Sequence, residues 1–171
     1  MHTYDYTLRG TVTLNAGITM LEVEAALAPF LRYCRTSHAE ALRTRQFEYA
    51  GPYLQLNLNF PGYYGPVPDQ EIRQLQAALR TVSMGADYIE LINHDAIRGE
   101  PSCTPLFIGS PEQQATAQMR YGLDALRTWV EPIIGSAAMD RVKAVVLGMT
   151  RLPVVDKAPG QALRSPTQEP G

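Results

Sequence analysis

The stretch YLQLNLNF at residues 53 to 60 alternates strictly between apolar and polar side chains, and it constrains the fold more than any other part of the chain. A period of two is the geometry of a β-strand, whose successive side chains point to opposite faces. It sorts the stretch into two sets, Leu54, Leu56, Leu58 and Phe60 on one face and Gln55, Asn57 and Asn59 on the other. A strand of this kind has one face in a core and one toward water, so the sequence predicts a sheet that is covered on one side.

Three further segments have strand character. Residues 3 to 14 alternate, with Tyr4, Tyr6, Leu8, Val12 and Leu14 on one face. Residues 43 to 50 also alternate, and the turn residues Gly51 and Pro52 join them to the stretch at 53 to 60, which favours a hairpin. Residues 87 to 93 form the next strand, with Ile89 and Leu91 buried in that register.

Two helices separate these strands. Thr19 and Glu22 have the spacing of a capping box, and apolar residues follow at helical spacing as far as Pro29, where we expect a bend or a break. A second box at 37 to 40 starts either a short helical turn or nothing. Asp69 can cap another helix, which Gly85 ends. The order β-α-β-β-α-β predicts an α+β fold of the ferredoxin-like kind, a four-stranded antiparallel sheet with two helices on one face.

The open sheet face of this arrangement is polar, and in the predicted register it presents Thr7, Arg9, Thr11, Gln55, Asn57 and Asn59. After a short strand at 105 to 109, Ser110 and Pro111 begin a helix that Pro132 is expected to end. Its apolar stripe is predicted to be Ala115, Met119, Leu123, Leu126 and Val130. A further helix from Ser136 completes a helical hairpin.

The predicted organisation is a ferredoxin-like domain at 1 to 97, a C-terminal helical hairpin at 98 to 151 docked on it, and a disordered tail at 152 to 171, where proline recurs and periodicity fades. The formal net charge of −2 provides no global field toward nucleic acid or an anionic membrane. No signal peptide and no apolar run of 18 residues is present, and with two cysteines we expect a cytoplasmic protein with reduced thiols.

Catalytic and metal-binding motifs are weak in this chain. Cys34 and His38 are four residues apart, which is too few ligands for a structural zinc site and is better explained by a buried thiol beside a surface histidine. His94, Asp95 and Cys103 contain the residue types of a thiol nucleophile, a base and an orienting acid, but adjacent strand residues point to opposite faces. Phosphate-loop and nucleophile-elbow motifs are absent. We therefore predict no catalytic residue, no metal and no cofactor, and we favour a protein that is not an enzyme.

Two features suggest a partner surface instead. Arg43 and Arg45 belong to an arginine cluster and, if 43 to 49 is a strand, they lie on one side of an edge strand. Such positive edges also discourage aggregation, which is the simpler explanation. The loop after residue 60 contains Tyr63 and Tyr64 between glycines and prolines. Tyrosine is common at interfaces because it adds area with little rotamer entropy to lose, although a loop that only redirects the chain is the simpler explanation.

The leading functional hypothesis is a non-enzymatic interaction protein, a small bacterial or phage accessory or inhibitor factor that docks on a larger protein or assembly through Tyr63, Tyr64, Arg43 and Arg45. The first alternative is a small-molecule binder or enzyme that uses the polar sheet face, and it needs a pocket beneath the C-terminal helices. The second alternative is a nucleic-acid binder that uses the arginine patch. Nucleic acid is an open but less favoured partner, a homodimer is also open, and membrane association is not expected.

Overall fold

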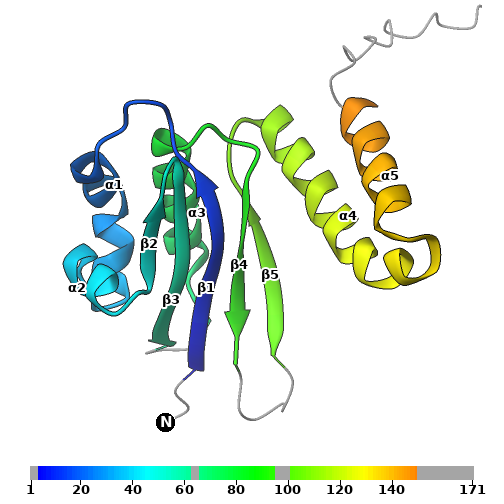
Figure 1. The fold of residues 1–171 in the computed structure, drawn as a ribbon. Coiled ribbons are helices and arrows are strands. Elements are labelled where there is room, and N and C mark those ends of the chain that lie inside the picture. Colours follow the sequence, from blue (N-terminus) through cyan, green and yellow to red (C-terminus); the bar gives the residue numbers. More distant parts are fainter. Residues whose placement is uncertain (1–3, 63–65, 95–100, 150–171) are drawn as a thin grey trace, which may run out of the picture.

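A computed structural model describes residues 4–62, 66–94 and 101–149 of the chain (Figure 1). In chain order the elements are β1 (Tyr4–Thr13), α1 (Met20–Tyr33), α2 (His38–Arg43), β2 (Phe47–Ala50), β3 (Tyr53–Gly62), α3 (Asp69–Val82), β4 (Tyr88–Asn93), β5 (Ser102–Phe107), α4 (Pro111–Ile134) and α5 (Ser136–Met149). The tail at 152 to 171, which was predicted to be disordered, lies outside the described residues.

The strands form one five-stranded antiparallel sheet in the order β2-β3-β1-β4-β5, which confirms the α+β class. The exact ferredoxin-like order of six elements is not reproduced, because α2 is inserted before β2 and a fifth strand, β5, follows β4. The predicted short strand at 105 to 109 begins earlier, at Ser102. An edge strand buries few side chains, so the apolar alternation that identifies a strand is weak there.

The core lies between one face of the sheet and the helices α1 and α3. Leu54, Leu58 and Leu8 are fully buried from the strand side. Leu27 of α1 and Leu79 of α3 meet them in the same hydrophobic cluster. The predicted strand register is therefore confirmed, since a slip of one residue would have turned every leucine of β3 to the opposite face.

Helix α1 begins as predicted and continues through its proline. The Thr19 backbone N–H donates to Glu22 Oε2 at 2.7 Å, and the Glu22 backbone N–H donates to Thr19 Oγ1 at 3.3 Å, so both halves of the capping box form. Pro29 lies inside the helix rather than at its end. The helix is maintained because its buried residues, including Leu27 and Phe30, are anchored on both sides of the proline.

The segment at 43 to 50 was predicted to be one strand, and this is wrong for its first half. Ser37 caps α2, because its hydroxyl accepts from the Glu40 backbone N–H at 3.1 Å, and the helix ends at Arg43. Arg45 follows with a left-handed φ of 57°, before β2 starts at Phe47. A formed cap and an adjacent helical ion pair stabilise this helical turn, and the short local alternation does not override them.

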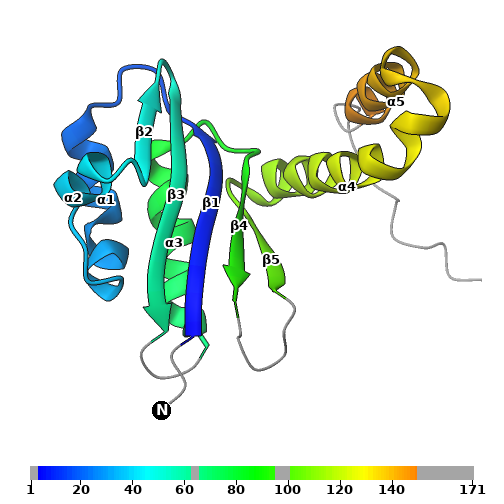
Figure 2. The ribbon, with the colours of Figure 1, turned by 60° about the horizontal axis from the view of Figure 1, so that its bottom comes forward.

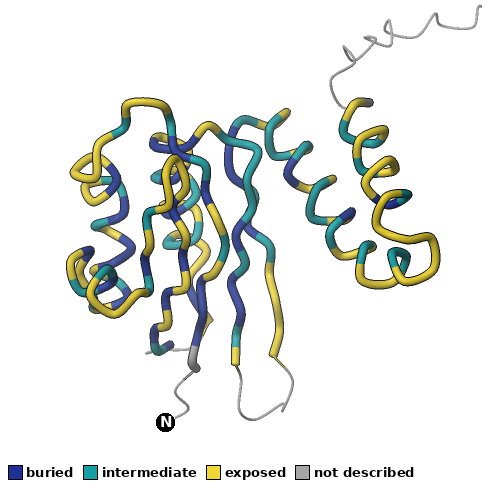
Figure 3. The backbone as a smooth tube through the Cα atoms, in the orientation of Figure 1, coloured by how far each residue is buried: buried dark blue, intermediate teal, exposed yellow. Residues whose placement is uncertain are grey.

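Helices α4 and α5 form an antiparallel hairpin that leaves the sheet at the end of β5. Figures 1 and 2 show α1, α2 and α3 on one side of the sheet and this hairpin on the other. α4 continues past Pro132 to Ile134, and Gly135 then turns the chain with a φ of 81°. Much of the hairpin surface is exposed or half-buried (Figure 3), in contrast to the buried central strands.

Candidate functional site

The hairpin and the polar sheet face enclose a cleft of about 1010 Å³. Its floor is the predicted open face of β1 and β3, including Thr11, Gln55 and Asn57, and its far wall carries Arg120 of α4 and Lys143 of α5. This is the pocket beneath the C-terminal helices that the small-molecule hypothesis required. Its helical wall could not be assigned from the sequence, because no pattern shows which side of α4 faces a distant sheet.

Opposite charges are paired across this cleft. On the floor, Arg9 Nε donates to Glu90 Oε2 at 2.8 Å, a pair brought together because β1 and β4 are neighbours in register. On the wall, Lys143 Nζ lies 2.7 Å from Asp124 Oδ1 and ties α5 to α4. Four basic and four acidic residues line the cleft in all, so their formal charges balance and the cleft has no strong preference for a ligand of either sign.

Two acidic groups where β4 begins, the Tyr88 hydroxyl and the Asp87 carboxyl, have raised pKa values. Burial, followed by the nearby Asp124 carboxylate, raises the pKa of Tyr88 to about 12, and the Tyr88 hydroxyl donates to Asp124 Oδ2 at 3.2 Å. Burial also raises the pKa of Asp87, although hydrogen bonds from the Thr13 backbone and hydroxyl partly oppose this effect. These groups hold the end of β4 against β1 and α4.

Helix α4 is fastened to the sheet at its first three turns. Ser110 caps it, and Gln113 Nε2 donates to the Met84 carbonyl oxygen at 2.8 Å, which links the cap to the loop before β4. Tyr121 then packs on the open face of β4 and β5. Its ring lies edge-on to Tyr88 and Phe107, with centroid distances of 5.1 and 6.0 Å. The polar face of β1 and β3, together with Tyr88 and Glu90 of β4, lines the cleft.

Of the four residues predicted to bind a partner, the structure describes Arg43 and Arg45, and these two lie on different surfaces. Arg43 forms an ion pair with Glu40, with Nη2 2.6 Å from Oε1, on the exposed surface of α2. Arg45 lies in the turn before β2 and lines the cleft. The edge-strand arrangement that was predicted for these two arginines is therefore wrong, while Tyr63 and Tyr64 lie outside the described residues.

A second hollow of about 490 Å³ contains a hydroxyl–imidazole contact at the end of the same sheet face. Thr7 Oγ1 lies 2.9 Å from His94 Nε2 and donates to Asn59 Oδ1 at 2.7 Å. Because the Thr7 proton is directed to Asn59, the contact with His94 uses a lone pair of the hydroxyl, and the imidazole then acts as the donor. This arrangement orders polar groups rather than activating a nucleophile. Asp95, the proposed orienting acid, lies outside the described residues.

The two thiols lie in different environments. Cys34 ends α1 and is buried, and burial raises its pKa. Cys103 is exposed on β5, where partial burial and Glu90 raise its pKa, so the reactive thiolate is disfavoured at both positions. His38 was expected at the surface, but it is buried, with Nε2 3.0 Å from the Tyr49 hydroxyl. Across residues 4–62, 66–94 and 101–149, no three potential metal ligands cluster.

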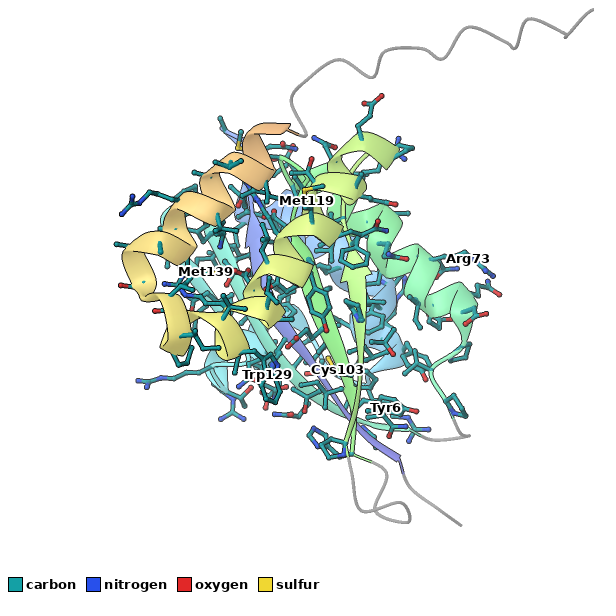
Figure 4. All side chains as sticks on the ribbon, turned by 90° about the vertical axis from the view of Figure 1, so that its right-hand side faces the viewer. Tyr6, Arg73, Cys103, Met119, Trp129 and Met139 are labelled. Carbon is teal, nitrogen blue, oxygen red and sulfur yellow. The ribbon has the colours of Figure 1, made fainter. Side chains whose placement is uncertain are left out.

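A row of exposed apolar side chains lies on the hairpin, and none of them lines the cleft. We call it the hairpin face, and it consists of Met119, Leu126, Trp129 and Ile133 of α4 with Val142 and Val145 of α5. Met119, Leu126 and Ile133 are seven residues apart and so follow one line along α4. Figure 4 shows Met119 and Trp129 along α4 and Met139 on α5.

The hairpin face was missed by the sequence prediction, which assigned Met119 and Leu126 to the buried stripe. Leu123 of that stripe is buried, whereas Leu126 is 45% and Trp129 77% exposed. The sequence does contain a signal for this second surface, since α4 has apolar residues on two sides rather than one. A helix that is apolar on two sides needs two neighbours, and α5 supplies one of them.

No helix in the described part of the chain is both long and apolar enough to span a bilayer. Comparison with protein-family models, with curated proteins and with solved structures found no match to this chain.

Proposed function

We propose that this protein is a non-enzymatic interaction protein that binds another protein chain through the hairpin face. One observation carries the proposal: Ile133 and Trp129, two of the largest apolar side chains of the hairpin, are 82% and 77% exposed on the same face. Tryptophan is among the residues most enriched at the energetic centres of protein interfaces. The contact surface would then be the hairpin rather than the arginine cluster.

The size of the hairpin face supports the same function. From its exposed fractions, with ~100 Å² for a free aliphatic side chain and ~200 Å² for tryptophan, it presents roughly 400 Å² of apolar surface. The largest apolar patch of a typical monomer is roughly 300–600 Å² and is often functional. Leu21 of α1 has one exposed apolar neighbour, Met20, and this pair is too small a patch to need such an explanation.

A site-specific crosslink tests this proposal in the cells that make the protein. A photo-crosslinking amino acid in place of Trp129 should give a covalent adduct of one defined mass, and Ile133→Asp in the same chain should abolish it. The matched control places the same amino acid at Leu21, which is 76% exposed but lies on α1. Equal adducts from both positions, or none from either, would refute the proposal.

A second function is favoured by a separate observation, the cleft between the sheet and the hairpin. Among the described residues, the side chains of Thr11, Gln55 and Asn57 on its floor form no hydrogen bond with one another or with a neighbour, so their donors and acceptors remain available. We propose that the cleft can also hold a small polar molecule that carries little net charge, because the basic and acidic residues that line the cleft are equal in number.

A thermal-shift screen tests the cleft separately from the hairpin face. Amino acids, sugars and nucleosides are the probes, and a true ligand raises the melting temperature in proportion to the logarithm of its concentration. Asn57→Ala should remove that shift, whereas Met84→Ala, an exposed position outside the cleft, should retain it. A shift that is identical in both variants would place the ligand elsewhere and exclude the cleft.

A further inference from the structure

We infer, on the basis of the proposed function, that the chain bound at the hairpin face is a second copy of this protein, so that two hairpins pack face to face as a four-helix layer. Each chain contributes one α4–α5 hairpin to such a layer. A C2 dimer uses the same patch on both chains, and therefore requires a patch that is complementary to itself.

The layering of the fold points to a missing neighbour of this kind. α5 packs mainly on α4, and the hairpin as a whole buries few large apolar side chains, with Leu123 of α4 and Met139 of α5 prominent among them. Helices gain most of their stability from packing an apolar face, and an isolated pair leaves half of that surface in water. Two antiparallel hairpins that face each other form the four-helix arrangement that closes the layer.

Charge complementarity favours an identical partner over a strongly charged one. None of the six residues of the hairpin face is charged. Three nearby charges pair within the hairpin, since Arg127 contacts Glu131 and its Nη2 lies 3.6 Å from Asp140 Oδ1, which leaves Arg141, whose Nε donates to the Ala137 carbonyl oxygen. An acidic or basic partner would therefore gain little here, whereas a second copy brings an uncharged face that meets no like charge.

The area also matches what a stable dimer needs. An interface is about 55–65% apolar, so the roughly 400 Å² of apolar surface on one hairpin corresponds to about 700 Å² per copy once its polar rim is included. Two copies would bury about 1,400 Å² in total, which lies inside the standard range of about 1,200–2,000 Å² for specific complexes. We expect a dimer with a dissociation constant at or below about 10 µM.

Sedimentation of the full chain tests the inference. The wild type should sediment at twice the 18.9 kDa of one chain at high concentration and should dissociate on dilution. Trp129 is the only tryptophan, so its fluorescence reports on this face alone, and its emission should shift to shorter wavelength as the dimer forms. Ile133→Asp and Val145→Asp should each weaken the dimer at least about 30-fold, while Leu21→Asp, equally exposed but on α1, should not.

Both aspartate substitutions are at exposed positions, so the variants should retain the wild-type circular dichroism spectrum and cooperative unfolding. A wild type that remains monomeric at 100-fold above the expected dissociation constant would overturn the inference. A dimer that persists in both aspartate variants would overturn it as well, because that dimer would use another surface. The crosslink from position 129 then separates the two proposals. An adduct to a different protein would support the interaction function and exclude self-association. If no adduct forms, both proposals are refuted.

Discussion

Tyr121 is expected to hold the hairpin against the sheet, and its replacement should weaken that attachment by a predictable amount. Tyr121→Ala removes two edge-to-face ring contacts, to Tyr88 at 5.1 Å and to Phe107 at 6.0 Å. Each such pair contributes about 0.5–1.5 kcal/mol beyond its buried area. Because Tyr121 is only half-buried, we expect a total loss of about 2 kcal/mol in the free energy of unfolding, and a melting temperature lower by about 4–8 °C.

The loss should be local as well as global. Urea unfolding followed by circular dichroism gives the change in free energy, and hydrogen exchange of the α4 amides shows where the structure opens. Tyr53→Ala is the matched control, since Tyr53 is an exposed tyrosine of β3, and it should cost less than about 0.5 kcal/mol. Equal losses for the two variants, or unchanged exchange in α4, would refute the view that Tyr121 fastens the hairpin.

Three further predictions concern the backbone, an acid and the thiols. Gly10→Ala should destabilise the protein by about 2–5 kcal/mol in urea unfolding, because Gly10 has a φ of 149° and an added Cβ would lie 2.9 Å from Ile89 Cα. Gly122→Ala is the control and should not destabilise the protein, because a Cβ added there has no neighbouring atom within 4 Å. Burial raises the folded-state pKa of Asp87 above its ordinary value of 3.8, so its contribution to stability is present below pH 3.8 and is lost as pH rises through the folded-state pKa. Asp87→Asn should remove this loss from the pH dependence of the free energy of unfolding. An unchanged pH dependence in the variant would contradict the prediction. A thiol reagent should modify Cys103 in the native protein and Cys34 only after unfolding, and rapid modification of both would contradict the burial of Cys34.

Much of the sheet could be predicted because its signals are local. The leucines of β3 determine a register by themselves, and that register places Gln55 and Asn57 on the open face. The caps at Thr19 and Ser110 similarly begin their helices at the expected positions. Each of these signals comes from residues that contact one another within a few positions, so a pattern in the sequence contains all the necessary information.

Predictions that depended on weaker or competing local signals did not succeed. Arg43 and Arg45 alternate with their neighbours as a strand would, but the Ser37 cap takes Arg43 into α2. Leu126 has helical spacing with Leu123 and was assigned to the buried stripe, yet it lies on the hairpin face. Helical spacing shows that residues share a side of a helix, but it does not show what that side contacts.

By itself, the sequence determined the α+β class, the register of the central strands and the polar character of one sheet face, because each is set by periodicity and capping within single segments. Only the tertiary structure decided that Tyr121 of α4 packs on the open face, that Lys143 and Arg9 line the same cleft, and that Trp129 is exposed outside it. These relations join residues that are up to 134 positions apart. They follow from the angle at which the hairpin packs on the sheet. Many contacts between the hairpin and the sheet determine that angle together, so no single segment of the sequence encodes it.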